Sequence, residues 1–336
     1  MPERATINEV VQIGIEGTAG VAAVANRLLL STSIELKGAG NINEFAPAGY
    51  KFATDTAIGK EWATGDISQE VADYEALAYL LAGCVRYAGT PTLQAGTAVT
   101  AGSAYTWTFT PSSASEDTIK TYTVEQGSSV RAHKAPYGLV NGLEISFDRE
   151  KVSVSGDLIG AQLQDGITLS TLSGTVSSVP ILPNTIDVYM DSVAGSIGTT
   201  KLTRAFSGSF KYGDRFSTGW PLNSAGTSFA FHVEKKPSAE LRLTVEADAA
   251  GMALLSAART SATRYFRIAA TGGTILNQGG TAYRYLLQID TYAEVVEPVA
   301  FSDEDGVYAA QFTLRPIHDS TLGRAFQITL RNTQTF

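Results

Sequence analysis

Apolar residues recur at every second position in many short stretches of this chain, and a period of two predicts β-strands. In the first half we expect a long hairpin over Tyr50–Val71, made of two extended segments around a turn at Ile58-Gly59-Lys60. Residues 38–49 and 88–103 are rich in Gly with Asn, Thr or Pro, and are expected to form loops. The remaining strands expected in this half are Val10–Glu16, Leu28–Lys37, Tyr105–Phe109, Thr121–Glu125, Gly142–Phe147 and Lys151–Ile159.

Two stretches have helical periodicity instead, Ala72–Leu81 and Ala247–Leu255. Each begins beside an Asp, either Asp73 or Asp248, whose carboxylate can accept hydrogen bonds from the free N–H groups of the first helical turn. The two Asp residues are 248 minus 73, or 175, positions apart. A helix that recurs half a chain away suggests a duplicated domain.

The strand pattern of the second half also repeats that of the first. Apolar positions in 206–212 repeat those in 30–36 at an offset of 206 minus 30, or 176. One detail does not match. The apolar positions before the first helix, Ile67 and Val71, are shifted by one residue relative to the apolar positions in 241–245 before the second helix. The alternative is that two unrelated antiparallel domains look alike at this level. The strands expected in the second half are Ile186–Met190, Phe206–Tyr212, Ser228–Glu234, Glu240–Glu246, Arg264–Ala269, Tyr283–Val296, Val307–Leu314 and Ala325–Leu330.

These patterns predict a mainly β (α+β) chain with two tandem antiparallel β-sandwich domains. We place the domains at residues 1–170 and 186–336, each with one flanking helix and a long hairpin. Residues 171–185 are rich in Ser, Gly and Thr, contain Pro180 and Pro183, and are expected to form a linker.

Composition narrows the possible functions. Charged residues make up 17% of the chain, and 33 acidic against 25 basic side chains give a net charge of -8, which disfavours gripping the phosphates of DNA. The first residues lack the pattern of a signal peptide, and no apolar run is long enough for a membrane anchor. Cys84 is the only cysteine, so no intramolecular disulfide can form. We expect a soluble protein that folds in the cytoplasm.

A search for reactive groups gives no site and no cofactor. His133, His232 and His318 are far apart in the sequence, and no nucleophile elbow, dinucleotide fingerprint or phosphate-binding loop occurs. Cys84 ends an apolar helix and is expected to be a buried, inert thiol. Asp303–Gly306 partly matches a calcium loop, but it lacks the third acidic position and the distant Glu, so a hairpin turn is expected. We therefore expect a protein that is not an enzyme.

In the order and the residue pattern of its segments, the chain resembles the major tail tube proteins of long-tailed (siphovirus-type) bacteriophages. The resemblance covers nearly the whole chain and includes no catalytic motif. The stretches that carry it are Gln12–Thr18, Asp73–Leu77 with Leu80, Leu81 and Gly83, Tyr122–Gly127, Gly142–Ser146, Ile289–Phe301, Asp303–Gly306, Phe312–Leu314 and Gly323–Ile328.

In that family, each domain is a β-sandwich with a flanking helix, and a long hairpin from each domain lines a central channel as part of a continuous barrel. Rings stack into a tube that conducts DNA from the capsid to the host. The resemblance implies a structural subunit of the virion tail, assembled in the host cytoplasm, whose partners are itself, other tail proteins and double-stranded DNA that passes without specific binding. An acidic channel would repel the DNA phosphates.

Family members commonly have one domain and form sixfold rings. Two domains in one chain imply trimeric rings with pseudo-sixfold symmetry, and a hexamer with the second half outside is the alternative. A non-catalytic β-sandwich adhesin or other surface-binding protein is the alternative function, and a carbohydrate-active enzyme is a third.

The resemblance places Tyr50–Val71 and Ser228–Glu246 at the channel. Strand side chains alternate between two faces, so some of these residues would face the lumen and others would not. Alternatively, their charges pair with Lys51, Lys60, Lys235 and Lys236 at subunit contacts. The acidic candidates for lining the lumen are Asp55, Glu61, Asp66, Glu234, Glu240 and Glu246.

Overall fold

Strands make up most of the molecule. The computed structural model describes residues 9–87, 89–95, 102–222, 226–260, 262–296 and 300–336. Strands account for 56% of the structure and helices for 8%, which confirms the predicted mainly-β fold class. The described elements include two α-helices, α1 (Leu77–Cys84) and α2 (Ala249–Arg259).

In the first half, strands pair in the order β3-β4-β9-β8-β7-β1, and each is antiparallel to its neighbours. β8 bends near Tyr137, whose φ is 57°, so that its beginning pairs with β7 and its end with β9. The strands of this half are β1 (Val10–Ile15), β2 (Arg27–Leu29), β3 (Ser33–Phe45), β4 (Asp55–Gln69), β5 (Thr92–Ala95), β6 (Ala104–Phe109), β7 (Tyr122–Gly127), β8 (Ala132–Phe147), β9 (Val152–Gly160) and β10 (Gln164–Ile167).

The second half repeats this arrangement. Its strands pair in the order β13-β16-β20-β18-β17-β12, again antiparallel throughout, and α2 follows β16 as α1 follows β4. These strands are β12 (Ile186–Asp191), β13 (Ala205–Gly213), β14 (Phe216–Gly219), β15 (Phe231–Glu234), β16 (Ser238–Glu246), β17 (Arg264–Gln278), β18 (Thr281–Val295), β19 (Ala300–Glu304), β20 (Val307–Pro316) and β21 (Phe326–Asn332), with a short 3-10 helix η3 (Ala194–Ser196) after β12.

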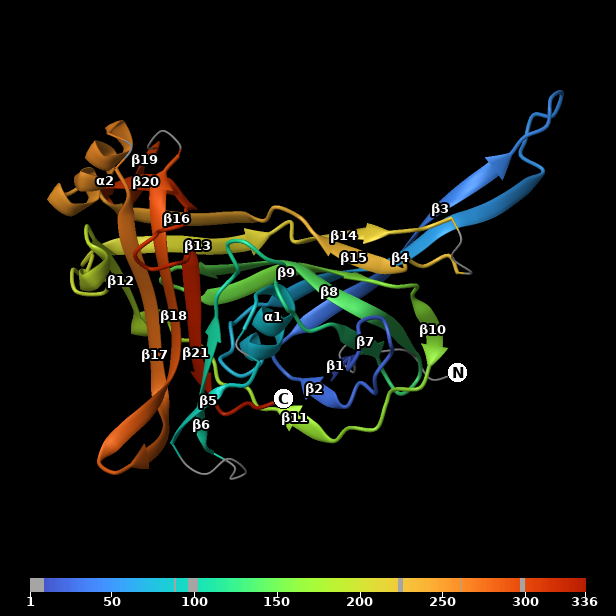
Figure 1. Cartoon of the computed structure of the whole chain (residues 1–336), viewed down its shortest axis with the longest axis horizontal. Helices are drawn as coiled ribbons and strands as arrows, with labels where there is room; N and C mark the ends of the chain where they lie inside the picture. Colours follow the sequence, from blue (N-terminus) through green and yellow to red (C-terminus); the bar gives the residue numbers. More distant parts are fainter. Residues whose placement is uncertain (1–8, 88, 96–101, 223–225, 261, 297–299) are drawn as a thin grey trace.

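The two halves share their sheets. β13 pairs with β8, so one sheet runs through both halves in the order β3-β4-β9-β8-β13-β16-β20-β18. β6 of the first half pairs in turn with β21 of the second. In Figure 1, β17, β21 and most of β18 run steeply to β8, β9 and β13, and only residues 293–295 of β18 pair with β20 of the long sheet. Buried residues of both sets of strands form one core cluster.

Helix α1 lies in that core. It packs against β8, and all of its residues are buried. Groups of the second half contact α1 and the turn before it, since the Phe336 ring stacks on Tyr79 at 4.5 Å between centroids and the Tyr285 hydroxyl donates to Glu75 Oε1 over 2.9 Å. Helix α2 leaves positions such as Ala249 exposed.

The expected helix caps are present. Asp73 Oδ1 accepts hydrogen bonds from the N–H groups of Glu75 and Ala76, at 2.7 and 3.0 Å. Asp248 Oδ1 accepts one from the N–H of Gly251 at 2.8 Å. Both predicted caps are therefore present, but the bounds differ, because α1 is Leu77–Cys84 rather than Ala72–Leu81, and α2 is Ala249–Arg259 rather than Ala247–Leu255.

The first hairpin differs from its prediction. Residues 38–45 belong to β3, although they were expected to form a loop, and the turn of the hairpin lies between Phe45 and Asp55. The Ile58-Gly59-Lys60 segment is not a turn, because Gly59 is an extra residue in β4 where the register shifts opposite Asn41. An extra glycine inside a strand and a glycine in a turn give the same local sequence signal.

The second hairpin is also longer than expected. β15 pairs with β14, and β16 pairs with β13, so the hairpin spans residues 205–246 and the two predicted strands over 228–246 lie on one arm. β14 and β15 form its outer part and lie beside the base of the β3–β4 hairpin in Figure 1. Glu61 N–H donates to the carbonyl of Thr227 at 2.9 Å, which joins the two hairpins.

Part of the expected linker is ordered against residues 72–74, which precede α1. It contains β11 (Gly174–Val176), which pairs parallel to β2, and a 3-10 helix η2 (Pro183–Thr185). Ile181 is fully buried, and its N–H donates to the carbonyl of Ala72. Residue 88 and residues 96–101 of the expected first-half loop lie outside the described residues, and β5 occupies part of the rest.

The mismatch of one residue before the helices has a local cause. Ile34 pairs with Ile67, and Phe210 pairs with Leu241, so the buried faces correspond. Asp73 lies six positions after Ile67 (73 minus 67), whereas Asp248 lies seven positions after Leu241 (248 minus 241). The connection between strand and helix is one residue longer in the second half.

Candidate functional site

One face of the shared sheet carries polar side chains from both halves. On β16, for example, Leu241 and Leu243 are buried, and the intervening Arg242 is exposed. We call the outward set the polar face. Its residues on β3, β4, β9, β8, β13 and β16 are Glu35, Lys37, Asp66, Ser68, Ser155, Asp157, Glu144, Ser146, Ser209, Lys211, Glu240 and Arg242.

The polar face is continuous across the junction between the halves. In one row of paired positions, Ser68 lies opposite Ser155, Ser155 opposite Glu144, Glu144 opposite Lys211, and Lys211 opposite Glu240. Residues of opposite charge thus occupy paired positions at the β8–β13 contact, and such cross-strand pairs stabilise a sheet.

Acidic residues outnumber basic ones on this face by five to three. Lys37 Nζ lies 2.8 Å from Asp66 Oδ2, and Arg242 Nε lies 2.5 Å from Glu240 Oε1. Burial raises the pKa of Asp157, the hydrogen bond from Asn141 opposes this rise, and nearby Asp214 adds to it. The face is therefore weakly acidic, and several of its charges are neutralised locally.

The predicted lumen candidates separate into two groups, and whether any of them faces a channel stays a prediction. Asp66 and Glu240 lie on the polar face. Asp55 lies on the same face by register but near the hairpin turn, where its carboxylate accepts a hydrogen bond from Thr56 N–H at 2.8 Å. Glu246, at the end of β16, forms an ion pair of 2.5 Å with Arg204.

Glu61 and Glu234 make contacts inside the chain instead. Glu61 pairs with Gly40, which places it on the face opposite Asp66, and its carboxylate accepts the Thr227 hydroxyl. Glu234 forms an ion pair with the buried Arg215 and accepts a hydrogen bond from Asp117 N–H at 2.7 Å.

Arg215 joins the two halves, and sequence patterns did not single it out. Its side chain is fully buried, and Nη2 lies 2.9 Å from Asp117 Oδ2. Nε donates to the carbonyl of Cys84 at 2.9 Å, and the guanidinium lies over the ring of Tyr212. The hydrogen-bond partners Asp117 and Cys84 are more than 90 positions away, so no local spacing identifies the cluster.

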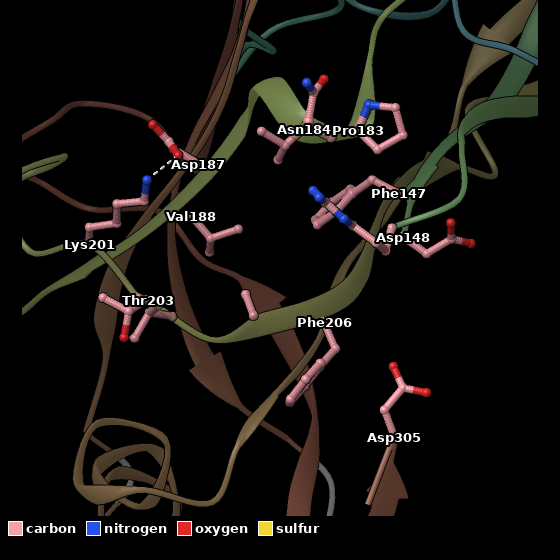
Figure 2. A pocket seen from close by; sticks show the side chains of 14 residues that line it. Phe147, Asp148, Pro183, Asn184, Asp187, Val188, Lys201, Thr203, Phe206 and Asp305 are labelled. Atoms are coloured by element: carbon pink, nitrogen blue, oxygen red, sulfur yellow. Dashed lines mark ion pairs between the residues drawn. The ribbon is translucent and has the colours of Figure 1, made fainter. Parts of the chain in front are cut away.

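A cavity of about 350 Å³ opens where the β8–β9 turn meets β12 and the start of β13. Figure 2 shows Phe147 and Asp148 on one side and Lys201 and Asp187 on the other. The ion pair with Asp187 raises the pKa of Lys201. None of the residues that line this cavity is a histidine or a cysteine, and its arrangement offers no nucleophile held by a base.

Within the described ranges, no three His, Cys, Asp or Glu side chains are grouped so that they would hold a metal ion. Cys84 is buried, and burial raises the pKa of its thiol to about 12. In the same described part of the chain, no helix has the length and apolar character required to cross a membrane.

Comparisons with known proteins give no family for this chain. A scan against protein-family models found no match. A search of curated proteins found no match either.

Proposed function

We propose that this chain is a structural subunit of a bacteriophage tail tube, in which three copies form a ring and rings stack around a channel for DNA. The observation that carries the proposal is the β8–β13 pairing, which joins two halves of the same strand order edge to edge. Two neighbouring subunits of a ring would be joined in the same way, so the chain resembles two subunits already connected.

The ends of the shared sheet support closure with further copies. β3 pairs with β4 and forms one end, and β19 lies beside β20 at the other end. An open edge strand favours pairing with another chain, and a closed barrel removes such edges. With two equivalent halves per chain, three chains give six equivalent positions around the ring.

The polar face suits the wall of a DNA channel. It has no cluster of unpaired cations, and its acidic excess repels a phosphate backbone without a strong field. Asp66 and Glu240 are the lumen candidates that this face favours.

Electron microscopy of the purified protein in negative stain tests the proposal. We expect rings or hollow tubes, and class averages with three protein copies per ring. Six copies per ring would favour the hexameric alternative. A chain that stays monomeric at high concentration would contradict the proposal and favour the adhesin alternative.

A further inference from the structure

The two long hairpins end in different environments. The β14–β15 extension of the second hairpin folds onto the first half, where Trp220 packs edge-on against Trp62 with 5.8 Å between centroids. The β3–β4 hairpin projects away from the body in Figure 1. Its end leaves Phe45, Tyr50 and Phe52 exposed to 63, 67 and 81%, so it presents aromatic side chains without a covering surface.

The repeated strand order shows which residues correspond in the two halves. In each half, four strands pair side by side, and one residue of each strand lies in a common row across them. The two rows start from buried apolar residues on corresponding strands, so we align them with each other. The rows are Ile34, Ile67, Gly156 and Leu143 in the first half, and Phe210, Leu241, Leu314 and Val295 in the second.

Residue offsets from these rows show which part of the second half corresponds to the first-half surface that β14–β15 contacts. Trp62 and Ile159 of the first half pack against the apolar cluster that includes Phe216 and Phe229 of the second hairpin. Trp62 precedes Ile67 by five residues, as Lys236 precedes Leu241. Ile159 follows Gly156 by three residues, as Ile317 follows Leu314. The corresponding surface on the second half therefore lies around Lys236 and Ile317.

A cavity of about 490 Å³ opens at that place. Lys236 lines it, together with Pro316 and His318, which flank Ile317 in sequence. Phe326 and Tyr212 form part of its inner wall. The Tyr212 hydroxyl is buried and has no hydrogen-bond partner among the described residues.

We propose that the end of the β3–β4 hairpin of one copy docks into this cavity on the second half of a neighbouring copy, as β14–β15 docks on the first half within one chain. The inference rests on the ring proposed above. Charge favours this occupant, because Glu44 and Asp55 outnumber Lys51 at the end of the hairpin, whereas Lys236 and Arg315 border the cavity. Glu294 pairs with Arg315 there and reduces its charge.

Cysteine cross-linking tests the contact, since the native Cys84 is buried. The test variant combines Phe45→Cys with His318→Cys, which are both exposed positions in the single chain. After mild oxidation of the assembled protein, we expect disulfide-linked trimers on a non-reducing gel. The matched control combines Phe45→Cys with the exposed Val193→Cys, far in sequence from the cavity, and should give no linked species above the background.

A second variant avoids engineered thiols. Phe45→Ser with Phe52→Ser should leave thermal unfolding of the single chain unchanged, because both side chains are exposed, and should raise the concentration needed for assembly. Rings that form with equal cross-linking in the test and control variants would overturn the hairpin contact and leave the proposed function standing. A chain that does not assemble at all would overturn both.

Discussion

The guanidinium of Arg215 lies 2.9 Å from the carboxylate of Asp117, and this buried contact connects the second hairpin to a loop of the first half. Arg215 also pairs with Glu234, so its removal leaves two carboxylates without their cation. Because uncompensated buried charges are costly, Arg215→Met should lower the free energy of unfolding by about 3–5 kcal/mol. Urea unfolding monitored by tryptophan fluorescence measures this.

The control for this prediction is Arg131→Met. Arg131 forms an ion pair with Asp165 in which both side chains are 44% exposed, and such pairs contribute about 1 kcal/mol or less. Equal effects of the two substitutions would show that the buried cluster does not hold the halves together.

The two helix caps should differ in importance. Asp73 is fully buried and also accepts a hydrogen bond from Val179 N–H at 2.6 Å, whereas Asp248 is exposed and accepts one from Gly251. Asp73→Ala leaves buried N–H groups unpaired and should cost about 3 kcal/mol, against about 1 kcal/mol for Asp248→Ala. Thermal unfolding of the two variants compares them, and a larger loss for Asp248→Ala would contradict this account.

His232 should make stability depend on pH. Burial lowers its pKa below 6.5, and Nδ1 lies 3.0 Å from the Tyr137 hydroxyl. The unfolded chain then binds a proton at a higher pH than the folded chain, so stability is complete above 6.5 and falls as the pH drops through that value. In the native chain, the midpoint of urea unfolding should be lower at pH 5.5 than at pH 8, and this difference should shrink in His232→Gln. A difference of the same size in the variant would show that other groups cause the pH dependence.

The cross-strand charges at the junction should contribute to stability. Lys211→Glu places like charges opposite both Glu144 and Glu240, and should cost about 0.5–1 kcal/mol for each pair at low salt. Adding Glu144→Lys should restore part of the loss, and high salt should reduce it. A double-mutant cycle with no coupling energy would exclude a direct interaction.

Charge reversal on the polar face tests the proposed channel. Glu35→Lys with Asp66→Lys adds cations to neighbouring positions, and assembled tubes of this variant should retain short duplex DNA in a salt-dependent way. The control is Asp303→Lys with Asp305→Lys in the exposed β19–β20 turn. DNA retention by both variants to the same extent would argue against a channel wall at Glu35 and Asp66.

Local patterns predicted local structure well. The alternation that buries Ile34 and Leu36, and the Asp residues that cap both helices, depend on neighbours only a few positions away. The hairpin turn was misplaced because Gly59 fits a turn and an extra residue in a strand equally well. The fold class therefore followed from the sequence, whereas the hairpin geometry did not.

Only some residues of the polar face could be anticipated from the sequence, and whether any of them faces a channel stays a prediction. Asp66 and Glu240 lie on the polar face, but Glu61 accepts the hydroxyl of the distant Thr227, and Glu234 pairs with Arg215 and accepts the N–H of the distant Asp117. Pairing of β8 with β13 depends on the fold as a whole, so no window of residues indicates it.

The β8–β13 junction has a consequence for the concentration dependence of assembly. Because both strands belong to one chain, they meet at a high effective concentration that is set by the connecting segment and does not change on dilution. In the proposed ring, half of the junctions would form in this way during folding, before any two copies meet. Only the junctions between copies would then depend on protein concentration. A critical concentration for tube growth would therefore report the affinity of the contact between copies alone.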